Sequence, residues 1–114
     1  MLNKEDSLKY YKRGLFMEIT QFLIEEIKDP TNIIEGKRYE FLLDVEVDEE
    51  DELYSEAGIE IRVLIGQKND GETYILNYFI VDKTENEYLD FALEDDEEAM
   101  ILAFCREQLL KNEL

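Results

Sequence analysis

Two segments in the middle of the chain alternate between apolar and polar residues with a period of two. In the first segment, residues 38–48, mostly acidic residues separate five apolar ones: Tyr39, Phe41, Leu43, Val45 and Val47. In the second segment, residues 58–66, polar residues and one leucine separate four apolar ones: Ile59, Ile61, Val63 and Ile65. Successive side chains of a β-strand point to opposite faces, so this pattern predicts two strands that each bury one face.

A third strand is predicted over residues 72–82, which are apolar at nearly every position and rich in β-branched and aromatic side chains. Because both of its faces are apolar, we expect a central strand that is covered twice. The Asp70-Gly71 pair before it indicates a hairpin, since such turns need a positive φ. An earlier strand is expected at about residues 18–28, and a short fifth strand at residues 87–91. The short connections favour antiparallel pairing between strands that are adjacent in sequence.

Near its end the chain changes from period two to a continuous apolar run, which predicts a helix. Five acidic residues, 94–98, precede this run, and acidic side chains suit a helix N-terminus because the macrodipole is positive there. Asp95 is the expected N-cap, and Glu98 completes a capping box. The side chains expected to pack on the sheet are Ala99, Leu102, Phe104, Leu109 and Leu110. The predicted fold class is α+β: a meandering antiparallel sheet of four to five strands with a C-terminal helix packed on one face.

One helix covers only one face of a sheet, so the apolar residues of the other face need a second cover. These residues are Leu42, Leu64, Ile75, Phe79 and Val81. One alternative is a short N-terminal helix built from Leu8, Tyr10, Tyr11, Leu15 and Phe16. The other alternative is a homodimer in which two chains pair through this face. The sequence leaves both open.

The first sixteen residues differ from the rest in charge, with four Lys or Arg and two Asp or Glu. Lys12-Arg13-Gly14 can be encoded by a purine run typical of a ribosome-binding sequence, and Met17 follows after a suitable spacer. We therefore predict that residues 1–16 are an N-terminal extension and that translation starts at Met17. Residues 17–114 are expected to form a single α+β domain. The intact mass of the native protein tests this prediction.

Thirty Asp and Glu residues against twelve Lys and Arg give the chain a net charge of −18, with no histidine. A field of this sign repels phosphate groups, so neither nucleic acid nor an anionic membrane is expected as a partner. Cationic partners are favoured, above all a basic protein. High net charge also keeps a small protein soluble, which needs no partner at all. The single cysteine, Cys105, excludes an intrachain disulfide, and we expect it to be buried in a cytoplasmic protein.

The missing residue types exclude most enzyme chemistries, and we expect a protein that is not an enzyme. Without histidine, Ser–His and Cys–His catalytic pairs are impossible, and zinc ligands are nearly absent. The five glycines form no phosphate-binding motif, so no cofactor and no metal are expected. Two alternatives stay open. Paired carboxylates could serve a small hydrolase or a carbohydrate-processing protein, and carboxylates spaced like phosphates could make the chain a nucleic-acid mimic.

The candidate site is the acidic loop between the two alternating strands. Its residues are Asp48, Glu49, Glu50, Asp51, Glu52, Leu53, Tyr54 and Glu56. The carboxylates could attract a divalent cation, but the loop lacks the sharp-turn glycine of a helix–loop–helix calcium site. Leu53 and Tyr54 follow no strand periodicity, so they either fold under the sheet edge as a plug or anchor a partner. We expect a protein-binding or regulatory module that meets a basic surface through this loop.

Four short segments resemble a group of small uncharacterised acidic proteins from bacilli-type bacteria. They are Lys28-Asp29-Pro30, residues 36–41, Glu52-Leu53-Tyr54 and residues 88–93. The resemblance covers roughly Met17 to the C-terminal helix and includes no catalytic motif, so it supplies no functional residues. Some members carry the label pullulanase, a starch-debranching enzyme. That activity is not implied, because such enzymes are built on (β/α)₈ barrels of about 250 residues.

Overall fold

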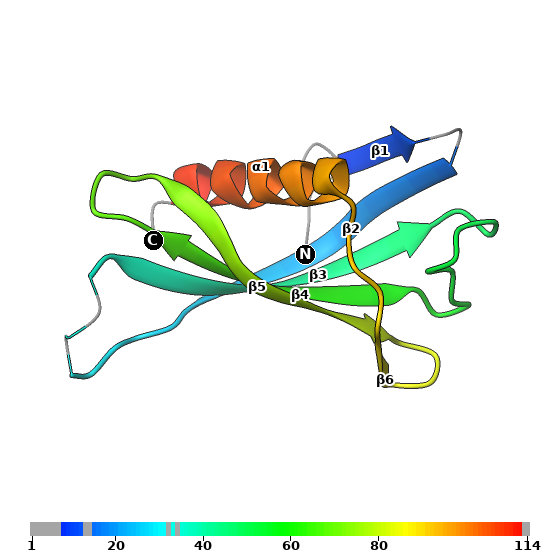
Figure 1. Cartoon of the computed structure of the whole chain (residues 1–114), viewed down its shortest axis with the longest axis horizontal. Coiled ribbons are helices and arrows are strands. Elements are labelled where there is room, and N and C mark those ends of the chain that lie inside the picture. The colour runs from blue at the N-terminus through cyan, green and yellow to red at the C-terminus, as the bar shows by residue number, and fades with distance from the viewer. Residues whose placement is uncertain (1–7, 13–14, 32, 34, 113–114) are drawn as a thin grey trace.

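The computed structural model describes residues 8–12, 15–31, 33 and 35–112, and shows one antiparallel sheet with one helix (Figure 1). The six strands are β1 (Leu8–Lys12), β2 (Leu15–Glu26), β3 (Lys37–Val47), β4 (Ile59–Gln67), β5 (Thr73–Asp82) and β6 (Glu87–Leu89). They lie side by side in sequence order, so each strand pairs only with its neighbours in the chain. The helix α1 (Asp95–Asn112) lies against one face of the sheet. The predicted α+β meander is therefore confirmed.

The alternation of β3 and β4 sorts their side chains as predicted. All five apolar residues at the odd positions of β3 are buried, and so are the four in β4. The strands pair so that Phe41 lies opposite Val63 and Leu43 opposite Ile61, which puts both apolar sets on the face that α1 covers. This face forms the hydrophobic core, and burial of these side chains is the main favourable term in folding.

The expected N-terminal helix is wrong, because Leu8–Lys12 forms strand β1 along the edge of β2. Pairing there satisfies backbone groups that an edge strand would otherwise leave open. The ammonium of Lys9 lies 4.7 Å from the ring centroid of Phe16, a cation–π contact across the hairpin. The sheet thus has six strands instead of four to five. Residues 1–7 and 13–14 lie outside the described residues, and the start at Met17 stays a prediction.

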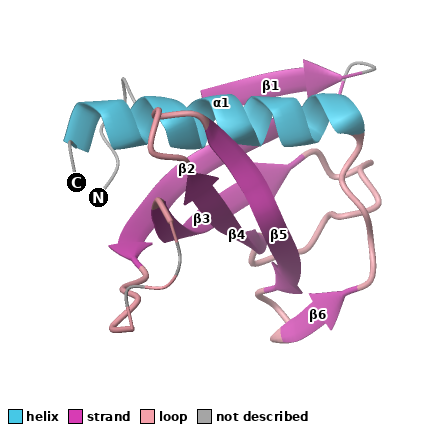
Figure 2. Ribbon diagram, turned by 60° about the vertical axis from the view of Figure 1, so that its left-hand side comes forward, coloured by secondary structure: helices cyan, strands magenta, loops and turns pink. Residues whose placement is uncertain are grey.

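The strands of the sheet are twisted beneath α1 (Figure 2), and their pairing contains two register shifts. One lies in β2 between Ile19 and Gln21, and the other lies where β4 passes from Leu64 to Ile65. A bulge inserts one residue and increases the local twist. The second shift leaves Leu76 without an opposite residue and pairs Ile75 with Ile65 on the core face. The prediction that Ile75 belongs to the second face is therefore wrong.

Strand β5 is not the doubly covered central strand that its composition suggested. It is the fifth of six strands, and the three-residue strand β6 pairs with its last three residues alone. On its outer side Tyr74, Leu76 and Phe79 are exposed. On the second face Leu42 and Leu64 are half-buried and Val81 is buried. Pairing of two chains through this face stays a prediction.

Helix α1 begins one residue earlier than its expected cap implies. The N–H of Glu98 donates to the carbonyl of Glu94 (2.9 Å), and the N–H of Glu94 donates to the carboxylate of Glu97 (2.8 Å). Glu94 therefore occupies the N-cap position expected for Asp95, and the carboxylate of Glu97, not of Glu98, reaches back to the N-cap N–H as in one half of a capping box. In the described part of the chain, no helix is both long enough and apolar enough to cross a membrane.

The face that α1 buries also differs from the prediction. The buried residues are Ile101, Phe104, Cys105, Gln108 and Leu109, which follow helical spacing. Ala99 and Leu110 were expected on the sheet, but both are exposed. Arg106 fastens the helix to β5 through a 2.9 Å hydrogen bond from its Nε to the hydroxyl of Thr73.

Candidate functional site: an acidic groove

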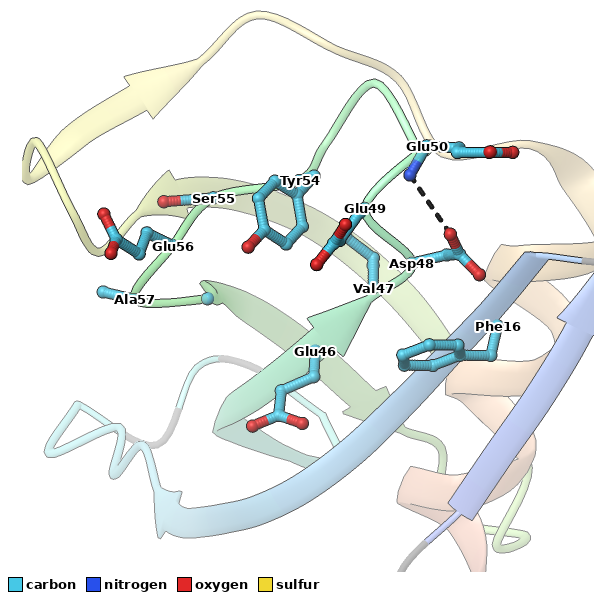
Figure 3. A pocket seen from close by; sticks show the side chains of 11 residues that line it. Phe16, Glu46, Val47, Asp48, Glu49, Glu50, Tyr54, Ser55, Glu56 and Ala57 are labelled. Carbon is cyan, nitrogen blue, oxygen red and sulfur yellow. Dashed lines mark hydrogen bonds between the residues drawn. The ribbon is translucent and has the colours of Figure 1, made fainter.

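The loop between β3 and β4 borders an open groove with a volume of about 550 Å³ (Figure 3). The lining residues come from the start of β2, the end of β3 and the loop: Phe16, Glu46, Val47, Asp48, Glu49, Glu50, Tyr54, Ser55, Glu56, Ala57 and Gly58. Strand β2 reaches the loop because the N–H of Asp48 donates to the carbonyl of Phe16 at 3.1 Å. The groove therefore combines residues that lie far apart in the sequence.

Two of the loop's carboxylates hold the loop itself in shape. Asp48 accepts a hydrogen bond from the N–H of Glu50 (3.1 Å; Figure 3), and Asp51 accepts one from the N–H of Leu53 (2.9 Å). Such contacts let an aspartate side chain imitate a backbone turn. The backbone adds two turn hydrogen bonds, from Asp51 to Asp48 and from Tyr54 to Asp51, both 2.9 Å long. Asp48 and Asp51 thus have structural roles that fix the positions of their neighbours.

Leu53 and Tyr54 point to different environments. Leu53 is 5% exposed and belongs to the hydrophobic core, so it is the plug that the sequence left as one alternative. It cannot also serve as a surface anchor. Tyr54 is 45% exposed and lines the groove, where its ring stands among the glutamates (Figure 3). Of the apolar pair, only Tyr54 can meet a partner.

The far end of the loop is attached to the turn between β5 and β6. The hydroxyl of Ser55 donates to the carboxylate of Asp82 at 2.5 Å and also makes a short contact with the hydroxyl of Thr84. Thr84 in turn accepts a 2.9 Å hydrogen bond from the N–H of Ala57. The hydrogen bond from Ser55, followed by one from the Thr84 backbone, lowers the pKa of Asp82 below its usual value. These contacts fix the wall of the groove that carries Ser55 and Glu56.

Five carboxylates line the groove, and no lysine or arginine is among the lining residues. They belong to Glu46, Asp48, Glu49, Glu50 and Glu56. Two aromatic rings, from Phe16 and Tyr54, complete the lining. Four of these carboxylates were predicted, whereas Glu52 and Asp51 do not line the groove. Glu46 and Phe16 were missed because both lie outside the loop. Glu46 lies near the end of β3, just before the loop, whereas Phe16 is brought to it by the contact between β2 and Asp48.

This arrangement suits a cation or a cationic side chain. Carboxylates that share one open groove create a negative potential there, and rings beside them can accept a cation on their faces. Among the residues that the structure describes, no three acidic or cysteine side chains are grouped closely enough to hold a metal ion. The groove therefore offers a distributed negative surface with an aromatic wall.

The fold and the groove define a small α+β protein, in which a meandering sheet carries an acidic groove at the end of its third strand. A family model described as "Family of unknown function (DUF6509)" matches residues 17–112. The chain belongs to this family. Comparison with the curated proteins and with the solved structures gives no match.

Proposed function

We propose that the chain is a protein-binding module that takes a basic segment of a partner protein into its acidic groove. The observation that supports this proposal is the lining of the groove, with five carboxylates, two aromatic rings and no lysine or arginine. Grouping these acids at one open site raises the local concentration of positively charged ligands.

The rings suggest how a lysine or arginine side chain would bind. Such side chains lay their methylene groups along apolar surface and keep the charged end near polar groups. Phe16 already has the Lys9 ammonium over its ring, so a ring of this groove accepts a cation. Tyr54, with glutamates on either side of it in Figure 3, offers a second ring of the same kind. A partner segment with two or three basic residues fits this lining.

The negative charge on the rest of the surface would increase the rate at which a basic partner associates. With a net charge of −18, the whole molecule attracts basic partners over a distance set by the ionic strength. Long-range attraction of this kind raises the association rate more than it slows dissociation. Binding of a basic partner should therefore weaken as salt is added, chiefly through slower association.

A pair of charge-matched variants separates groove binding from general attraction. The groove variant carries Glu49→Gln, Glu50→Gln and Glu56→Gln, and leaves the structural carboxylates in place. The control carries Glu25→Gln, Glu85→Gln and Glu87→Gln, three exposed glutamates that do not line the groove. The probe is a fluorescently labelled peptide of alternating lysine and leucine residues, and the measurement is fluorescence anisotropy.

We expect the groove variant to raise the Kd about tenfold or more, and the control to change it about twofold at most. Tyr54→Ala should also weaken binding although it removes no charge. If both triple variants weaken binding equally and Tyr54→Ala has no effect, the attraction is general and the proposal of a groove site is wrong.

A further inference from the structure

A second groove, of about 530 Å³, lies between the end of β5 and the segment that follows β6. Its lining residues are Asn77, Tyr78, Phe79, Ile80, Tyr88, Leu89, Asp90, Phe91 and Ala92. Only Asp90 among these nine is charged, in a chain of which 37% is charged. The chemistry of this groove is thus opposite to that of the acidic groove.

Three aromatic side chains of this groove are exposed to solvent, and we call them the aromatic patch. Phe79 is 44% exposed, Tyr88 is 69% exposed and Phe91 is 42% exposed. The rings of Phe79 and Tyr88 meet edge to face, with centroids 6.1 Å apart and planes at 72°. Single exposed apolar residues are ordinary, but a group of aromatic residues in a groove is typical of an interface.

The strand beside the patch is also unusual for the edge of a sheet. In the described part of the chain, no strand pairs with residues 73–79 of β5 along the edge of the sheet that faces away from β4. Residues 73–81 also carry no charged side chain. Exposed edges are usually protected by charged residues. Here the side-chain oxygen of Asn77 accepts the N–H of Tyr78 (2.8 Å), and the bulge at Leu76 interrupts the ladder. These features disfavour addition of a strand and leave the aromatic side chains as the contact surface.

We propose that a second copy of this chain docks on the aromatic patch, with the two patches facing each other across a two-fold axis. In such an interface each molecule contributes the same surface. Two copies that each carry a charge of −18 can approach closely only through surface that carries few carboxylates. The aromatic patch meets this condition, whereas the acidic groove does not. The rings of Phe79 and Tyr88 would then pack against their counterparts.

Salt distinguishes this association from binding at the acidic groove. Screening removes the repulsion between two acidic molecules and leaves apolar contacts intact, so the dimer should become tighter as salt is added. Sedimentation velocity of the full chain over a series of protein concentrations, at about 20 mM and about 500 mM NaCl, measures this directly. Binding of the basic peptide should change in the opposite direction, so one proposal can fail while the other holds.

Matched variants locate the interface. Phe79→Glu with Tyr88→Glu adds two charges to the patch, and Leu23→Glu with Leu110→Glu adds two charges at exposed apolar positions elsewhere. We expect the patch variant to raise the dimer Kd at least about tenfold and the control about twofold at most. Circular dichroism checks that both variants are folded. A chain that is monomeric under every condition, or a dimer that both variants weaken equally, would overturn the proposal.

Cross-linking gives an independent reading that does not depend on added charge. Tyr88→Cys places a thiol at the most exposed position of the patch, whereas Leu110→Cys places one on the exposed side of α1, and the natural Cys105 is buried. In a dimer of the Tyr88→Cys variant, a mild oxidant at high salt should join the two introduced thiols in an intermolecular disulfide. A denaturing gel run without reductant detects the cross-linked dimer. Equal cross-linking by both variants would contradict a dimer centred on Tyr88.

Discussion

The hydroxyl of Ser55 donates a 2.5 Å hydrogen bond to the carboxylate of Asp82, which lies 27 positions further along the chain. The same carboxylate accepts a 2.8 Å hydrogen bond from the N–H of Thr84. One carboxylate therefore joins the acidic loop to the turn between β5 and β6. The groove depends on this link for the position of one of its walls.

Ser55→Ala should destabilise the fold at neutral pH, and the loss should shrink in acid. The Ser55 hydrogen bond is the main reason that the pKa of Asp82 is lowered in the folded state. A lowered carboxyl pKa stabilises the fold fully above the unfolded-state value, about 3.9, and this contribution disappears as the pH falls through the lower folded-state value. Urea unfolding of both proteins from neutral pH down to below that value measures the difference. A difference that stays constant across this range would contradict the assignment to Asp82.

Leu53→Ala should cost about 2–4 kcal/mol of unfolding free energy, because it empties a buried site beneath the loop. Tyr54→Ala, at the neighbouring exposed position, should change stability by about 0.5 kcal/mol or less. Chemical denaturation of the two variants tests the contrast. Equal costs would mean that Leu53 is not the plug of this loop.

The sequence predicts an element well when that element buries only one face, because its apolar residues then recur with a regular period. Strands β3 and β4 each bury one face, so Phe41 and Ile61 show their orientation in the sequence itself. Residues 99–105 of the helix are apolar on all sides, so they indicate a helix without indicating which side faces the sheet. The burial of Gln108 had no sequence signal. Strand β1 depends on the free edge of β2, a tertiary feature that local pattern does not contain.

The candidate site shows the same limit. The acidic residues of the loop are visible in the sequence, but their division into structural and lining residues is decided by turn hydrogen bonds. Asp51 serves the backbone of the loop, whereas Glu49 lines the groove. Phe16 joins the site because β2, which is distant from the loop in sequence, lies beside the start of the loop. No spacing within residues 48–56 could have identified it.

Gly36→Ala should be much more damaging than Gly71→Ala. Both glycines have a positive φ, 77° and 94°, which costs a residue with a Cβ about 1–2 kcal/mol. At Gly36 the added Cβ would also lie 2.2 Å from the carbonyl oxygen of Gln67, so the backbone of β4 would have to move. At Gly71 nothing lies within 4 Å. Thermal unfolding of the two variants measures the difference, and equal shifts would show that the contact with Gln67 is unimportant.

Glu25→Lys should stabilise the fold by about 0.2–1 kcal/mol at low salt, because Glu25 lies directly opposite Glu40 in the β2–β3 pair. The variant replaces a like-charge pair with an opposite-charge pair. Glu25→Gln is the control and should give a smaller gain, since it removes repulsion without adding attraction. Both gains should decrease as salt is added, and gains that do not depend on salt would point to a cause other than charge.

The thiol of Cys105 should be unreactive in the folded protein. It is fully buried, and burial raises its pKa above the ordinary value, so the reactive thiolate is scarce at neutral pH. A colorimetric disulfide reagent should label Cys105 quickly in denaturant and very slowly without it. Fast labelling of the folded chain would show that α1 detaches from the sheet readily.

The order of the strands has a consequence for how the chain is made. Because the strands of the meander are synthesised in the same order in which they pair, each hairpin can close soon after its second strand appears. The residues that shield the core face, Asp95–Asn112, follow all six strands in the sequence. During synthesis the apolar face of the sheet is therefore exposed to solvent until the helix has been made. A chain that stops before position 95 should bind chaperones or aggregate.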